Sequence, residues 1–199
     1  MKYCTDYPRD PTLAPSLPRH DFADGATWGH RIVRELEAGA SGWIYWNLLL
    51  NRRGGPYATS PTHGDAPQNW QHPVVIVDTE RGTFEPTGLF YFLAHFSRFL
   101  RPGAVRVGTH QTADLTARRV SAVAFAGGSG AVEETTETVE ETTEETVEET
   151  VEETVEETVM QLVNRGATAQ RVAICGGDGR VAELELPAVS ITTARWTEH

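Results

Sequence analysis

Aromatic side chains that could bind a ligand gather in the stretch Gly42-Trp43-Ile44-Tyr45-Trp46-Asn47. In an extended chain alternate side chains face opposite sides, so Ile44 and Trp46 are expected on one face and Trp43 and Tyr45 on the other. An indole followed by an amide suits a sugar, because the apolar face of a pyranose stacks on the ring while amides bind its hydroxyls. The alternative is that these rings fill a core, since large aromatic side chains are mostly buried.

Other reactive residue types are scattered along the chain. The seven histidines form no HExxH pair or other ligand spacing. Among them, His95 lies between apolar helix positions and is expected to be a packing residue. Cys4 and Cys175 are too few for a disulfide framework or a Cys-x-x-Cys zinc site, and both are expected to be free thiols. The sequence therefore predicts no metal and no cofactor.

The net charge of −11 belongs to one segment. Residues 132–159 hold 13 of the 28 acidic residues and no basic residue, which leaves 15 acidic against 17 basic residues elsewhere. No basic patch with interleaved aromatics is present, so nucleic acid is not expected as a partner. No apolar run approaches 18 residues, and the first residues have no apolar core, so neither a membrane span nor a signal peptide is predicted on this chain.

The first half of the chain predicts the helices and strands that position the aromatic stretch. The first element is a helix with Asp24 as N-cap and Gly39 at its end, and a buried strand over 42–46 follows it. A long loop over 51–72 comes next, and then a short apolar run over Val74–Val77. The last element is a second helix, with Pro86 in its first turn and Pro102-Gly103 after its last turn.

Beyond residue 103 the sequence pattern changes to short β-type segments. They lie at 105–107, 120–125, 172–174, 182–186 and 190–196, separated by glycine turns, and this spacing predicts an antiparallel β-sandwich. The residues on either side of the acidic repeat over 132–159 are predicted to form one β-hairpin, into which the repeat is inserted. It is expected to be a solvated low-complexity insertion, with a calcium- or partner-binding segment and an ordered strand as the alternatives.

Several motifs in one order resemble glycoside hydrolase family 30, the glucosylceramidase-type enzymes. They are Gly42–Pro56, Asn69-Trp70, Pro73–Asp78, Phe90–Phe99 and Arg101–Gly108. The resemblance implies a fold class of α/β plus all-β, in which a (β/α)8 TIM barrel precedes an antiparallel β-sandwich domain.

The resemblance also implies a division of the chain. Residues 1–103 would be the C-terminal portion of the barrel, with strand 8 and its flanking helices, and residues 104–199 the sandwich, interrupted by 132–159. A complete barrel needs about 250 residues, so we expect a C-terminal fragment.

Members of this family are retaining β-glycosidases with two catalytic glutamates. This chain contains no Asn-Glu-Pro, the motif of the acid/base, and Phe84 precedes its Glu85-Pro86. The resemblance aligns Lys2 with the nucleophile. We therefore expect no catalytic residue and no activity in this chain alone.

The resemblance assigns substrate contacts to Trp46, Asn69 and Trp70, with a carbohydrate or glycolipid as the substrate. It gives Asn47 and Asn51 a structural role in the following loop. The alternative function is a non-catalytic carbohydrate-binding or interaction module. The resemblance leaves the localisation open, with a secreted or periplasmic parent enzyme as the expectation.

A strand over 42–46 without barrel neighbours has open edges, which predicts self-association. For the same reason, residues 1–70 are expected to be loosely held. The ordered core is then expected over 85–131 and 162–196.

Overall fold

The structure is a computed structural model that describes residues 19–52, 72–112, 114, 117–128 and 157–197. In these residues the elements follow in the order α1 (Phe22–Glu37), β1 (Leu49–Leu50), β2 (Val75–Asp78), β3 (Thr83–Pro86), α2 (Gly88–Phe99), β4 (Val105–Val107), β5 (Val120–Ala126), β6 (Glu157–Asn164), β7 (Gln170–Cys175), β8 (Val181–Leu186) and β9 (Ser190–Thr197). No described helix is long and apolar enough to cross a membrane.

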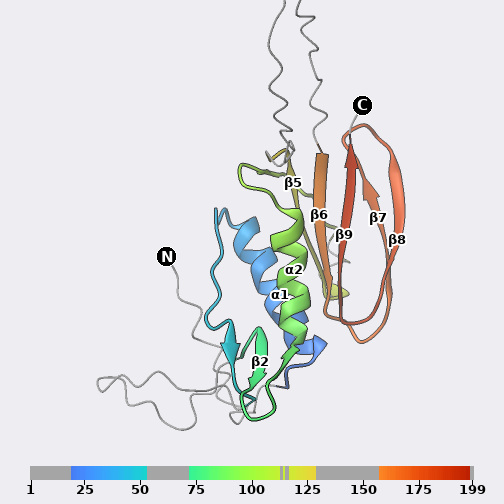
Figure 1. The fold of residues 1–199 in the computed structure, drawn as a ribbon. Helices are drawn as coiled ribbons and strands as arrows, with labels where there is room; N and C mark the ends of the chain where they lie inside the picture. Colours follow the sequence, from blue (N-terminus) through green and yellow to red (C-terminus); the bar gives the residue numbers. More distant parts are fainter. Residues whose placement is uncertain (1–18, 53–71, 113, 115–116, 129–156, 198–199) are drawn as a thin grey trace, which may run out of the picture.

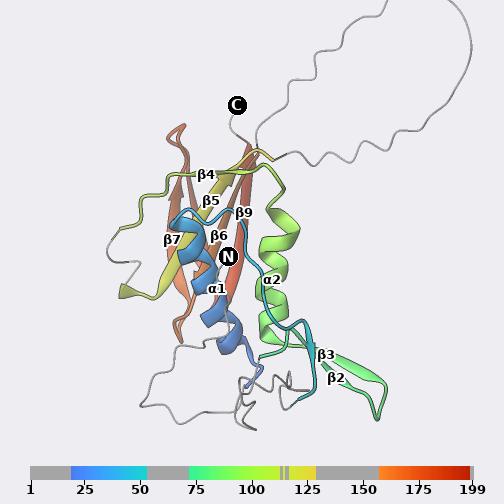
Figure 2. The same ribbon diagram turned by 90° about the vertical axis from the view of Figure 1, so that its left-hand side faces the viewer.

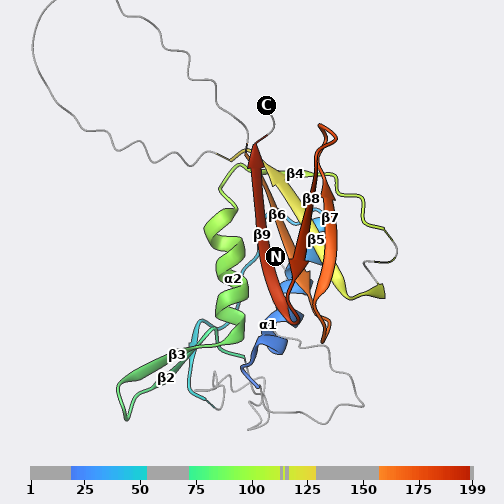
Figure 3. The ribbon, with the colours of Figure 1, turned by 90° about the vertical axis from the view of Figure 1, so that its right-hand side faces the viewer.

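The elements are stacked around a four-stranded antiparallel sheet with the order β4-β5-β6-β9. Helices α1 and α2 lie side by side on one face of this sheet (Figure 1). The antiparallel pair β7–β8 covers the other face (Figure 3). The chain between α1 and β1 runs extended across the outer side of the two helices (Figure 2).

Strands β5 and β6 are apolar on both faces because each face is covered. Val123, Phe125 and Val163 pack with both helices in the main core. Neighbouring positions, such as Ala122 and Leu162, face β7–β8 in a second apolar cluster. Alternate residues thus serve two cores, which explains why these strands read as continuous apolar runs rather than as alternating ones.

The predicted start of α1 is wrong by one turn, whereas its predicted end is confirmed. Asp21 is the N-cap, and its Oδ1 accepts the N–H of Asp24 at 3.0 Å. This is the usual reach from an N-cap side chain to the third helical residue. Gly39 follows the helix with φ +92°, and its N–H donates to the carbonyl of Leu36. Glycine suits this left-handed position because it has no Cβ.

The stripe predicted for the second helix is confirmed, but the place of Pro86 is wrong. Leu89, Phe92 and Phe96 are buried on one face of α2. Pro86 ends β3, and Thr87 occupies the N-cap position. The Thr87 hydroxyl donates to the carbonyls of Pro73 and Val74, at 3.0 and 2.9 Å, and so links α2 to the chain before β2.

The strand predicted over 42–46 is extended but joins no sheet ladder; its inner face, with Trp43 and Tyr45, is half-buried, and its outer face is exposed. Ile44 and Trp46 are 72% and 52% exposed. The ladder begins at β1, which pairs in parallel with β2, and β2 pairs antiparallel with β3. The prediction of a buried strand is therefore wrong, because no described residue forms a layer over the outer face.

Two further expectations need correction. Helix α1 contributes Ile32 and Val33, 1% and 0% exposed, to the main core, so the described part of residues 1–70 is not loosely attached. The last three residues of the predicted insertion, 157–159, belong to β6, where Thr158 pairs with Ala126 and Trp196. The rest of that segment, 132–156, lies outside the described residues.

Close approach of α1 to α2 depends on glycine. A Cβ on Gly25 would lie 2.6 Å from the carbonyl carbon of Gly88. One on Gly29 would lie 2.5 Å from Cδ1 of Phe92, a ring that is fully buried. Neither site has room for a methyl group unless the helices separate.

Each helix is also tied to the sheet by a histidine. His30 Nδ1 lies 3.0 Å from the hydroxyl of Ser121 on β5. His95 Nδ1 lies 2.7 Å from the hydroxyl of Thr193 on β9, which donates to Gln161 Oε1 at 2.7 Å, while Gln161 Nε2 donates to the His95 carbonyl. The expectation that His95 is a packing residue is confirmed.

Burial lowers the pKa of His95. Burial, then the charges of Arg165 and Arg34, lower the pKa of His30 to about 4.

We expect Gly25→Ala to lower the free energy of unfolding by about 1–3 kcal/mol, because overpacking a tight contact costs this much. The effect opposes helix propensity, which favours alanine by about 1 kcal/mol. Gly42→Ala is the matched control, since a Cβ on Gly42 meets no atom within 4 Å. Urea unfolding measures both variants, and a Gly25→Ala protein as stable as the wild type would contradict the close helix contact.

The free energy of unfolding is expected to fall as the pH falls from about 6.5 toward 4, because in this range the unfolded chain binds a proton at His30 that the folded chain does not. His30→Gln removes the group, so the pH slope of stability becomes flatter. Urea unfolding at a series of pH values measures it, with the exposed His110→Gln as the control that keeps the wild-type slope. Equal slopes in the two variants would show that His30 is not the group responsible.

Candidate functional site

Both helices begin at the end of the molecule where the extended segment 42–50 finishes (Figures 1 and 2). The segment and each helix therefore run in opposite directions, as in a β/α unit. In folds built from such units, functional groups collect where strands end and the following helices begin. Trp46 lies in the part of the segment that approaches this end.

The alternation predicted for the aromatic stretch is confirmed. The rings of Trp43 and Tyr45 stack at 5.7 Å on the inner face, and Tyr45 packs edge-on against the buried Trp28 at 5.0 Å. Trp43 Nε1 donates to Glu35 Oε2 at 2.7 Å. The core role thus holds for Trp43 and Tyr45, whereas the half-exposed Trp46 has a ring surface available to a ligand.

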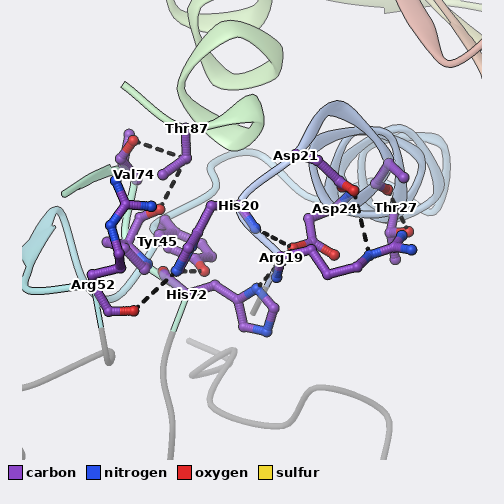
Figure 4. Close-up of polar contacts among 12 residues, drawn as sticks. Arg19, His20, Asp21, Asp24, Thr27, Tyr45, Arg52, His72, Val74 and Thr87 are labelled. Atoms are coloured by element: carbon purple, nitrogen blue, oxygen red, sulfur yellow. Dashed lines mark hydrogen bonds and ion pairs between the residues drawn. The ribbon is translucent and has the colours of Figure 1, made fainter. Parts of the chain in front are cut away.

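A buried carboxylate organises the polar groups at this end (Figure 4). Asp24, 6% exposed, accepts the N–H groups of Arg19 and His20 at its Oδ2, both at 2.8 Å. The same oxygen lies 3.7 Å from His72 Nδ1. The Tyr45 hydroxyl donates to the His72 carbonyl at 2.7 Å. Asp24 therefore connects the start of α1, the residues before β2 and, through His72, the aromatic stretch.

Burial and charge act against each other at His72. Burial lowers its pKa, the charge of Asp24 raises it, and His20 lowers it. The net direction is downward, so His72 is neutral at pH 7 beside the Asp24 carboxylate. Backbone N–H groups at the start of α1 bind the Asp24 carboxylate, and the helix dipole also favours an anion at this position.

A second set of contacts ties the neighbouring strands to this end. His20, with φ +61°, places its Nε2 3.3 Å from the carbonyl of Arg52. Arg52 forms an ion pair with Glu85 on β3. The N–H of Gly88 donates to the His20 carbonyl at 3.0 Å, which joins the start of α2 to the start of α1.

Of the residues with predicted site roles, Trp46 lies in the described part of the chain, whereas Lys2, Asn69 and Trp70 lie outside it. The Asn47 carbonyl accepts the N–H of Val74 at 3.3 Å. Cys175 is an exposed free thiol, as expected. No group of three or more His, Cys, Asp or Glu residues in the described ranges is placed to hold a metal ion.

Sequence reasoning missed the roles of Asp24 and His72. An acidic residue near a helix start reads as a cap, and a histidine before a proline carries no signal of its own. Their proximity arises only when the residues before β2 fold against the start of α1.

The elements around this end coincide with a known domain. The glycosyl hydrolase family 30 TIM-barrel domain matches residues 16–100. Over residues 16–100, the chain is similar to glycosyl hydrolase family 30. This family 30 region contains α1, the extended segment, the sheet β1-β2-β3 and α2, and the match ends before β4.

Two relatives are similar to part of this chain. The lysosomal acid glucosylceramidase of Mus musculus is 35% identical over 83 residues, which are 42% of this chain and 15% of the relative. A Caenorhabditis elegans protein named "Putative glucosylceramidase 3" is 32% identical over 107 residues, which are 52% of this chain and 18% of the relative. The chain thus spans less than a fifth of the length of these relatives.

We expect Asp24→Ala to lower the free energy of unfolding by about 1–3 kcal/mol, because the partly buried backbone N–H groups of Arg19 and His20 lose their acceptor. Asp114→Ala is the control, since it removes an exposed carboxylate and should change stability by less than about 0.5 kcal/mol. Asp24→Asn keeps an acceptor but removes the charge, so the pKa of His72 should fall further. Thermal unfolding and NMR titration measure the two effects. An unchanged His72 pKa in Asp24→Asn would contradict the coupling.

Proposed function

We propose that the family 30 region forms one wall of the sugar-binding site of a retaining β-glycosidase that acts on β-glucosidic bonds. The substrate class is a β-glucoside, including glycolipids of the glucosylceramide type, which the names of the relatives favour. The observation that carries the proposal is the half-exposed indole of Trp46, on the segment that runs toward the end where α1 and α2 begin (Figure 2).

Trp46 suits a sugar platform because its neighbours hold the segment from behind. Trp43 and Tyr45 stack on the inner face and pack against the buried Trp28, so the backbone that carries Trp46 rests on an aromatic layer. An indole held in this way offers an apolar ring face to a pyranose with little loss of conformational entropy on binding. We assign Asn69 and Trp70 to the same sugar site, as polar and aromatic contacts.

We propose that these 199 residues bind the sugar but do not hydrolyse it. Retention requires two carboxyl groups about 5–5.5 Å apart, one as nucleophile and one as acid/base. The chain contains no Asn-Glu-Pro, and Lys2 stands where the resemblance places the nucleophile. Glu85 forms an ion pair with Arg52, and its side chain is 58% exposed.

The proposed architecture follows the same assignment. Residues 1–103 represent the C-terminal portion of a TIM barrel, with the extended segment as its eighth strand. Residues 104–199, which contain β4–β9, represent the β-sandwich. The packing of α1 and α2 on the β4-β5-β6-β9 sheet supports the view that these two parts form one folding unit.

A non-catalytic carbohydrate-binding module is the second candidate. It is favoured by the same exposed indole together with the missing glutamate motif. The two candidates differ in their activity: only the glycosidase must hydrolyse a β-glucoside when the rest of the barrel is supplied.

We expect the 199-residue protein to bind methyl β-glucoside without turning over an aryl β-glucoside. Trp46→Ala should weaken binding by about tenfold, because the stacking surface is lost. Phe84→Ala is the matched control, since that ring on β3 is 76% exposed and has no assigned role. Calorimetric or NMR titration measures the binding.

Equal affinity in Trp46→Ala and the wild type would contradict the platform. Turnover that survives Glu85→Gln would contradict the absence of a catalytic pair. Binding by the 199 residues, with no turnover by a version extended with an upstream family 30 barrel, would favour the binding module over the enzyme.

A further inference from the structure

Two arginine side chains at one end of the β4-β5-β6-β9 sheet have no counter-charge. Arg119 directly precedes β5 and Arg165 directly follows β6. In the described part of the chain, neither guanidinium group forms a hydrogen bond or an ion pair, and Arg165 Nε is buried without a partner. The neighbouring Arg118 differs, because it is paired with Asp114 at 2.9 Å.

The two arginines lie opposite each other on neighbouring strands. The N–H of Arg165 donates to the carbonyl of Arg119 at 3.0 Å, one step beyond the pair of Val120 with Asn164. Burial, then the charge of Arg119, lower the pKa of Arg165, so the two guanidinium groups are also near each other. Like charges directly opposite on antiparallel strands destabilise a sheet, and a partly buried cation is costly without a counter-ion. A bound anion would remove both costs.

Helix α1 adds a third polar group at this place. Val163, two residues before Arg165, packs with the helices, so Arg165 lies on the helix side of the sheet. His30 of α1 lies on this side too, with its Nδ1 3.0 Å from the Ser121 hydroxyl, and the charge of Arg165 contributes to its lowered pKa. Nε2 of His30 forms no hydrogen bond with a described residue. One imidazole nitrogen and two guanidinium groups therefore lie near one another between α1 and the sheet.

We propose that Arg119, Arg165 and His30 form a binding site for a small tetrahedral oxyanion of the phosphate or sulfate type. Guanidinium groups bind such oxyanions through two parallel N–H···O bonds. Two neighbouring cations favour a doubly charged anion over a carboxylate, and a tetrahedral ion has enough oxygen atoms to accept from all three side chains. The bound anion relieves the repulsion between the arginines and connects α1 to the sheet.

This site is independent of the proposed sugar site. Its residues lie on the sheet side of α1, whereas the extended segment crosses the outer side of the helices (Figure 2). Arg119 and Arg165 also lie outside residues 16–100, which match family 30. Anion binding without sugar binding, or the reverse, therefore separates the two proposals.

Calorimetric titration with inorganic phosphate at pH 7 tests the site. Sodium chloride keeps the ionic strength constant, because salt alone screens surface charges. The wild type is expected to bind one phosphate with a dissociation constant of the order of 1 mM. Arg165→Gln and Arg119→Gln should each weaken binding at least about tenfold, because each removes a charged donor. Arg81→Gln is the matched control, since that side chain is 82% exposed and paired with Asp78, and it should bind as the wild type does.

The pKa of His30 gives a second readout, which a change in stability alone would not produce. An anion beside the imidazole favours its charged form, so the pKa should rise from about 4. NMR titration in sulfate and in chloride of equal ionic strength measures this rise, because sulfate keeps two charges at this pH. The rise should be absent in Arg165→Gln. This variant is expected to remain folded, since it removes one of two repelling cations, and circular dichroism verifies it.

Glycerol 3-phosphate identifies the source of the oxyanion. Binding tighter than that of phosphate supports a phosphate ester as the ligand, and weaker binding supports the free ion. A wild type without saturable phosphate binding overturns the proposal. So does an Arg165→Gln variant that binds phosphate as Arg81→Gln does, or a His30 pKa that sulfate leaves unchanged.

Discussion

Contact between α1 and α2 is the constraint on which the rest of this structure depends. Because Gly25 and Gly88 have no Cβ, the two helix backbones approach until the Phe92 ring fills the space beside Gly29. At this separation both helices pack on the same face of the β4-β5-β6-β9 sheet, against Val123 and Val163. The histidine–hydroxyl bonds from α1 to β5 and from α2 to β9 then fix the helices along the sheet. Apolar burial supplies the driving force, and the glycines and histidines decide where each helix lies.

The position of the helices determines the geometry of the candidate site. With both N-termini at one end, the carboxylate of Asp24 can reach the backbone before α1 and the ring of His72 together. The extended segment lies over the helices, and its inner aromatic rings bind it there. Its outer face, which bears Ile44 and Trp46, has no described layer over it. This exposure underlies the proposed sugar platform, since a half-exposed indole offers its ring face to a pyranose.

The amino-acid sequence by itself determined the local features of this protein. The helical stripe at Leu89 and Phe92, the glycine end of α1 and the alternation of Ile44 with Tyr45 follow from short-range geometry, and each is found in the structure. The similarity of residues 16–100 to family 30 likewise rests on motifs along the chain and needs no coordinates. These features are readable because their physical cause lies within a few residues of each other: side-chain periodicity, backbone freedom at glycine, and a run of matched residues.

Only the tertiary structure decided which surfaces are covered. The sequence cannot distinguish the half-buried Tyr45 from the more exposed Trp46 by residue type, because both are large aromatics and the difference lies in what packs over each face. It marks Asp24 as a cap, although folding buries that carboxylate beside His72, a residue 48 positions later in the chain. It also places residues 157–159 in an insertion, although their pairing with β5 and β9 makes them part of a strand. In each case the deciding contact joins residues far apart in the chain, and neither periodicity nor composition contains that information.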